Sequence, residues 1–139
     1  MNLTVGFVLS LLVTVGLLAS VVVSGIRRKR NVHYASVTAF FVSLGLAVVL
    51  ARAFGARGGG LHFEAAHTTQ LLHRIAIGLT FLLVPFLVVS GVKLARARGA
   101  DEPAIRKAHH GLAIGFVLLF LVTAALGTVM TWQALAATG

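Results

Sequence analysis

Long uncharged apolar stretches alternate with short polar segments along this chain. They run from 1 to 26, 31 to 51, 75 to 92 and 108 to 139, and the third can be extended over partly polar turns to about residue 68. An apolar helix of roughly 20 residues is long enough to cross a bilayer. The pattern therefore predicts four membrane-spanning helices, over about 3–26, 31–52, 68–93 and 105–133.

The composition favours a membrane protein over a soluble one. Hydrophobic residues make up 58% of the 139 residues and the mean hydropathy is +0.99, whereas a soluble domain is about half apolar. The runs are continuous, without the in–out alternation over roughly 10 residues that marks a barrel strand. Short connections make neighbouring helices antiparallel. We therefore expect an all-α, up-down-up-down bundle of four transmembrane helices, forming a single domain over residues 1–139.

Small residues recur at four-residue spacing on the first span. In lipid such positions let helix backbones approach closely, because packing replaces the hydrophobic drive of water. The spacing predicts a close helix contact along Gly6, Ser10 and Thr14, and again along Gly16, Ser20 and Ser24.

The placement of the basic residues predicts the orientation in the membrane. The net charge is +9, and residues 27–30 are all basic, as are several residues of the third connection between 93 and 107. The second connection carries only Arg52 and Arg57. By the positive-inside rule the first and third loops are cytoplasmic, and both termini lie outside. Topology accounts for the cations, so we expect lipid around the chain and no nucleic-acid partner.

A repeated phrase indicates a duplicated helical hairpin. Val-Ser-Gly at 23–25 precedes a basic run and His33, and Val-Ser-Gly at 89–91 precedes a basic loop, His109 and His110. His33 and His110 each stand three residues beyond a cation, about 4.5 Å of helix rise. The two histidines are therefore expected at a similar, shallow depth on the same side of the membrane.

These histidines are candidate ligands of one haem iron. Ionisable groups within membrane spans are functional candidates, and diagonal helices in a four-helix ring lie about 11–14 Å apart, which suits two imidazoles on one iron. The chain has no cysteine, so thioether attachment is excluded. We expect haem b between His33 and either His109 or His110. The surrounding positions expected to meet the propionates or give room to the macrocycle are Arg30, Arg106 and Gly111. The alternative is that these are interfacial histidines bonded to headgroups or helix ends.

A second group of histidines opens the third span. His67 and His73 fall on different faces of a helix, and a second ligand for His73 on the fourth span could come only from Met130. The position equivalent to His73 in the first hairpin is Phe7. We therefore expect one haem per chain, with a second metal site at His73, His67 and Met130 as the weaker alternative. His67 or His73, with Arg74, could instead line a quinone pocket.

His33 opens the second span, Leu-Leu-His at 71–73 opens the third, and His109 opens the fourth with Gly127 eighteen residues later. In these features the chain resembles, over about residues 20–132, a small four-helix family of bacterial membrane proteins linked to cytochrome c oxidase assembly. The resemblance implies a place in the bacterial inner membrane and favours His109 as the ligand, whereas depth matching favours His110. The sequence leaves the choice between His109 and His110 open.

More loosely, the chain resembles four-helix b-type cytochromes, which hold bis-histidine haem between helices. This resemblance leads us to expect a haem-binding membrane protein with a respiratory-chain membrane partner, acting as an electron-transfer or haem-linked accessory subunit. The alternative is an oxidase assembly factor or structural subunit without a redox cofactor. No nucleophile with an adjacent base stands out, so independent catalysis is not expected.

Overall fold

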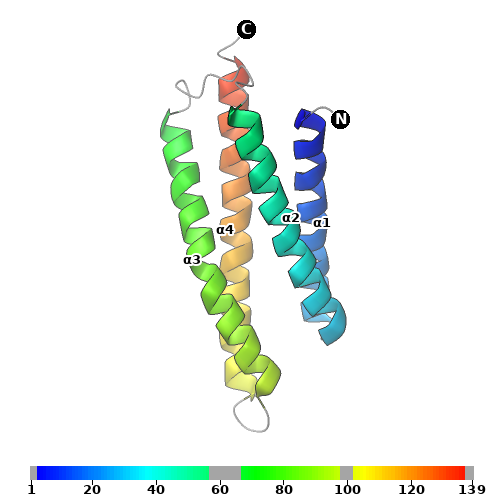
Figure 1. Cartoon of the computed structure of the whole chain (residues 1–139). Helices are drawn as coiled ribbons and strands as arrows, with labels where there is room; N and C mark the ends of the chain where they lie inside the picture. Colours follow the sequence, from blue (N-terminus) through cyan, green and yellow to red (C-terminus); the bar gives the residue numbers. More distant parts are fainter. Residues whose placement is uncertain (1–2, 57–66, 98–101, 137–139) are drawn as a thin grey trace. The chain divides into compact units, whose positions relative to one another are not determined.

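Four long helices account for almost all of the described structure, a computed structural model that covers residues 3–56, 67–97 and 102–136 (Figure 1). They are α1 (Leu3–Ile26), α2 (Arg30–Ala56), α3 (His67–Arg96) and α4 (Glu102–Ala136). Each contains a stretch long and apolar enough to cross a membrane. The prediction of an all-α membrane protein with four spanning helices is confirmed. Outside the described residues or side chains lie Phe7, Arg52, Arg57 and Arg98.

The helices pack in two antiparallel pairs, α1 on α2 and α3 on α4 (Figure 1). The chain accordingly divides into two compact units, Met1–Gly59 and Gly60–Gly139. We call them hairpin 1 and hairpin 2 and describe each by itself. The prediction of one domain over residues 1–139 concerns how the hairpins associate, and it stays a prediction.

Hydroxyl side chains hold hairpin 1 together. Thr14 is fully buried, donates to the carbonyl oxygen of Ser10 at 2.7 Å, and lies 2.7 Å from the hydroxyl of Ser43 on α2. Nearer the turn between α1 and α2, the hydroxyls of Ser20 and Ser36 are 2.8 Å apart. Small side chains allow the two backbones to approach, and each hydroxyl finds a partner within the hairpin. Ser10, Thr14 and Ser20 thus lie at the close contact that the sequence predicts. The prediction is wrong at Gly16, which is exposed and where a Cβ would meet nothing within 4 Å.

Hairpin 2 repeats this arrangement. Thr80 is buried, donates to the carbonyl oxygen of Ala76 at 2.7 Å, and lies 3.3 Å from the hydroxyl of Thr123 on α4. Thr14 and Thr80 each stand eleven residues before the glycine of a Val-Ser-Gly phrase. The buried core positions therefore follow the same repeat as the sequence.

Aromatic side chains follow the repeat as well. Phe40 and Phe116 are buried, and each stands seven residues after a histidine, His33 and His109 respectively. In hairpin 2 the ring of Phe116 stacks on that of Phe120. The aromatic core of each hairpin thus begins two helical turns beyond its histidine.

Large apolar side chains cover the outer faces of both hairpins. Leu12, Val42, Leu82 and Leu118 are all exposed. Exposed apolar helix faces are costly in water but suit contact with lipid. The helices thus have the surface expected of a multi-pass membrane protein.

The turn of hairpin 1 is a Schellman motif with an arginine in the left-handed position. The amide of Lys29 donates to the carbonyl oxygen of Ser24 at 3.0 Å, and that of Arg28 to Gly25 at 3.2 Å. Arg28 has a φ of 55°, where glycine is usual. The first turn of α2 follows directly, and there the backbone amide of His33 donates to the carbonyl oxygen of Lys29 at 2.9 Å. This tight turn sets His33 opposite the end of α1.

Replacing Arg28 by glycine is expected to stabilise hairpin 1, because glycine adopts a positive φ without the steric penalty that a Cβ brings. The expected gain in the free energy of unfolding is about 1 kcal/mol. Arg27→Gly removes the same charge without relieving a positive φ, and it serves as the control. Unfolding in detergent, followed by circular dichroism, measures both. Equal stability of the two variants would show that the turn stores no such strain.

Candidate functional site: three histidines packed on glycines

His33, in the first turn of α2, lies against Gly25 of α1. A Cβ at Gly25 would stand 3.3 Å from Cε1 of His33 and 3.4 Å from its Nδ1. Nδ1 itself is 3.1 Å from the carbonyl oxygen of Val21 and 3.4 Å from the hydroxyl of Ser24. A carbonyl oxygen can only accept. His33 therefore carries its proton on Nδ1 when neutral, and its Nε2 has the lone pair.

His109 of α4 repeats this contact in hairpin 2. A Cβ at Gly91 would lie 3.4 Å from Cε1 of His109 and 3.9 Å from its Nδ1. The hydroxyl of Ser90 is 2.9 Å from Nδ1 and donates its own proton to the carbonyl oxygen of Leu87 at 3.0 Å. Because a serine hydroxyl has a single proton, it accepts from Nδ1. With the hydroxyl proton directed to the carbonyl oxygen of Leu87, we assign His109 the Nδ1-protonated tautomer as well.

His73 of α3 makes the tightest contact of this kind. A Cβ at Gly127 of α4 would lie 3.0 Å from Cε1 of His73, 3.5 Å from Nδ1 and 3.6 Å from Nε2. Nδ1 donates to the carbonyl oxygen of Thr123 at 2.9 Å. Thr123 stands four residues before Gly127, as Val21 stands four residues before Gly25. His73 and His33 therefore share one geometry, at different places in the two hairpins.

This tautomer leaves Nε2 as the basic nitrogen of each ring. Among the described residues, Nε2 of His33 and of His73 has no hydrogen-bond partner, and neither nitrogen is buried. Histidines that ligate metals almost always give the other ring N–H to a carbonyl, carboxylate or water, which fixes the ring and raises its basicity. His33 and His73 are therefore arranged as single metal donors. In the part of the chain that is described, no three His, Asp or Glu side chains gather into a metal site.

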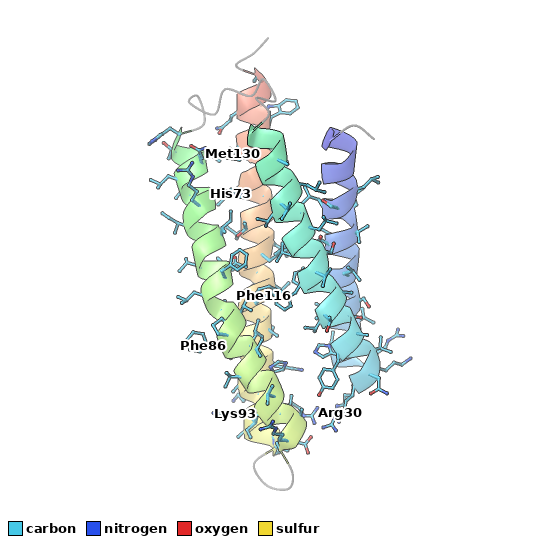
Figure 2. All side chains as sticks on the ribbon, viewed as in Figure 1. Arg30, His73, Phe86, Lys93, Phe116 and Met130 are labelled. Atoms are coloured by element: carbon cyan, nitrogen blue, oxygen red, sulfur yellow. The ribbon has the colours of Figure 1, made fainter. Side chains whose placement is uncertain are left out.

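The two contacts of hairpin 2 lie at opposite ends of one span. On α3, His73 and Gly91 are eighteen residues apart, and on α4 so are His109 and Gly127, about 27 Å of helix. The antiparallel pairing therefore brings each histidine onto the other helix's glycine. Figure 2 shows His73 and Met130 towards one end of hairpin 2 and Lys93 towards the other. The helix length of about 27 Å between the two contacts is close to the roughly 30 Å hydrocarbon thickness of a bilayer.

The other predicted site residues do not share these contacts. His110 is exposed, and so are Arg30 and His67. Met130 is half-buried one turn beyond Gly127. Arg106 forms an ion pair with Glu102 one turn earlier on α4. Gly111 is exposed, and a Cβ there would meet nothing within 4 Å, so its expected role beside the histidine pair stays a prediction.

The glycine partners are the part of the site that sequence reasoning missed. Gly25 and Gly91 belong to the repeated Val-Ser-Gly phrase, and Gly127 was noted eighteen residues after His109. None of these glycines was predicted to contact a histidine ring. The matching interval from His73 to Gly91 carried that signal, because equal intervals on two antiparallel helices bring both ends into register.

Comparison of the chain with protein-family models, with curated proteins and with solved structures finds no match. The fold and the site define the class as a multi-pass, all-α membrane protein with histidines held on glycines inside its hairpins.

Proposed function

We propose that this protein binds haem b within a membrane, through His33 and His109, and serves a respiratory chain as an electron-transfer or haem-linked accessory subunit. The observation that carries the proposal is the hydrogen bond that Nδ1 of each ring makes inside its own hairpin. With the proton on Nδ1, Nε2 carries the lone pair. This is the state in which imidazole binds iron.

The two ligands stand at equivalent positions of the repeat. Each follows an arginine by three residues and packs on the glycine of a Val-Ser-Gly phrase. A bis-histidine haem needs two such donors, and in this proposal each hairpin would contribute one. Support for His109 over His110 comes from this equivalence, since His110 is exposed and the Ser90 and Gly91 contacts are made by its neighbour.

The donor set fits a non-covalently held haem. Two imidazoles and the lack of any cysteine suit a b-type site. Arg30 is exposed at the start of α2 and could meet a propionate, whereas Arg106 would have to exchange its pairing with Glu102. The haem would supply one-electron redox chemistry, and the protein would fix the ligands and their basicity.

The proposed setting is the bacterial inner membrane, with the basic loops in the cytoplasm and both termini outside. Residues 27–30, between the first two helices, are all basic, and this supports the orientation. The proposed partner is a membrane component of the respiratory chain. His73, whose Nε2 is not buried, could accept a hydrogen bond there from the hydroxyl of a quinol, the reduced form of a quinone.

The competing function is that of an oxidase assembly factor or structural subunit without a redox cofactor. One observation favours it: His73 has the same Nδ1 bond and glycine contact as His33, although Phe7 stands at its equivalent position in hairpin 1. Imidazole packed on glycine can therefore also serve to hold two helices together.

A visible spectrum of the purified protein separates the two functions. We expect a Soret band and an α band that sharpens on reduction, with about one haem per chain by pyridine haemochrome assay, as one bis-histidine site requires. The His33→Ala, His109→Ala double variant, purified in the same way, is the control. A featureless spectrum after expression with ample haem would favour the cofactor-free function. Two haems per chain, one lost on replacing His73 or Met130, would establish a second site.

A further inference from the structure

The Nδ1–H groups of the two proposed haem ligands donate hydrogen bonds to different acceptors, although a serine stands at the same place in both repeats. In hairpin 1 the acceptor is the backbone carbonyl oxygen of Val21, which lies 3.1 Å from Nδ1 of His33. The hydroxyl of Ser24 is more distant, at 3.4 Å, and donates to the carbonyl oxygen of Ser20 at 2.6 Å. Ser24 is therefore a weak partner of His33.

In hairpin 2 the serine lies within the hydrogen-bonded chain. Ser90 accepts from Nδ1 of His109 at 2.9 Å and donates to the carbonyl oxygen of Leu87 at 3.0 Å. Leu87 stands four residues before Gly91, the place that Val21 occupies before Gly25. The hydroxyl of Ser90 thus links the ring to the carbonyl that the first hairpin uses directly.

We propose that Ser90 is a positioning residue that fixes the tautomer of His109 and raises the basicity of its Nε2, a role that Ser24 does not have for His33. The proposal rests on the proposed function where it concerns haem, and on hairpin 2 alone where it concerns the tautomer. An acceptor on Nδ1–H pushes electron density onto the ligating nitrogen and stabilises ferric iron. Losing that acceptor therefore raises the midpoint potential and weakens the iron bond.

Ser90→Ala and Ser24→Ala form a matched pair, since each removes one hydroxyl from the same position of the repeat. In Ser90→Ala we expect haem affinity to fall by about 10-fold or more, the usual cost of losing a partner behind a metal ligand, with a positive shift of the midpoint potential. In Ser24→Ala both quantities should stay close to wild type, because Val21 still accepts from His33. Ser90→Thr keeps a hydroxyl and should restore both.

The tautomer is measured separately in the haem-free, full-length protein labelled with ¹⁵N-histidine, at about pH 8, where an ordinary imidazole is neutral. The His109 signal, assigned by its loss in His109→Gln, should report an Nδ1–H ring in wild type and in Ser24→Ala, and a mixture of tautomers in Ser90→Ala. An unchanged His109 tautomer in Ser90→Ala overturns the role of Ser90. A changed tautomer in a protein that binds no haem would keep the positioning role and reject the haem function. Equal shifts of potential in the two serine variants would also reject the proposed difference.

Discussion

Replacing His109 by alanine is expected to abolish the low-spin spectrum of the proposed haem, whereas replacing His110 by alanine should leave it intact. Only His109 has its ring on Gly91 and its Nδ1 on Ser90. His110 follows one residue later, about 100° around the helix, and is exposed. His33→Ala should match His109→Ala, since the proposed bis-imidazole haem would need both rings. The measurement is the reduced-minus-oxidised spectrum, with electron paramagnetic resonance of the oxidised protein.

Added imidazole provides the control for misfolding. In His33→Ala or His109→Ala the missing ring leaves a gap beside a glycine, and free imidazole should bind there and return part of the low-spin signal. No such rescue is expected to change the His110→Ala spectrum. A His110→Ala variant that loses the signal, while His109→Ala keeps it, would assign the ligand to the exposed neighbour and remove the basis of the equivalence between the two hairpins.

The helices could be predicted from the sequence because membrane spans require long apolar runs, and charges end them. The observed bounds differ from the expected ones by a few residues at most: α3 begins at His67 and α4 extends over Glu102–Ala136. The Val-Ser-Gly phrase likewise marked the two places where a histidine packs on the preceding helix. The glycine of the phrase leaves room for an imidazole ring. This role can be recognised only when it is known which helices pack together.

The choice between His109 and His110 depends on helix rotation, which sequence depth does not describe. One residue changes depth by about 1.5 Å but turns a side chain by about 100°. Depth matching therefore cannot distinguish the two neighbours, whereas helix rotation turns only His109 towards Ser90 and Gly91, which is the basis for proposing it. The ion pair of Arg106 with Glu102 was also not anticipated, because the cation was weighed against a cofactor and not against a carboxylate one turn away.

Gly127→Ala is expected to destabilise hairpin 2 by about 1–3 kcal/mol, the usual cost of overpacking a close contact. The added Cβ would stand 3.0 Å from Cε1 of His73, and the ring cannot simply swing away while its Nδ1 is bonded to Thr123 at 2.9 Å. Gly115→Ala on the same helix is the matched control. Nothing lies within 4 Å of a Cβ there, and alanine should stabilise the helix slightly.

The same clash makes a double-mutant cycle informative. Once His73→Ala has removed the ring, adding Gly127→Ala should cost little, so the two changes should be strongly non-additive. The other two glycines should rank by space: a Cβ would stand 3.3 Å from His33 at Gly25 and 3.4 Å from His109 at Gly91, so Gly25→Ala and Gly91→Ala should cost less than Gly127→Ala. Unfolding in detergent, followed by circular dichroism, gives all these values. If Gly127→Ala proves as stable as Gly115→Ala, the ring of His73 does not rest on Gly127, and the reciprocal histidine–glycine register of α3 and α4 is wrong.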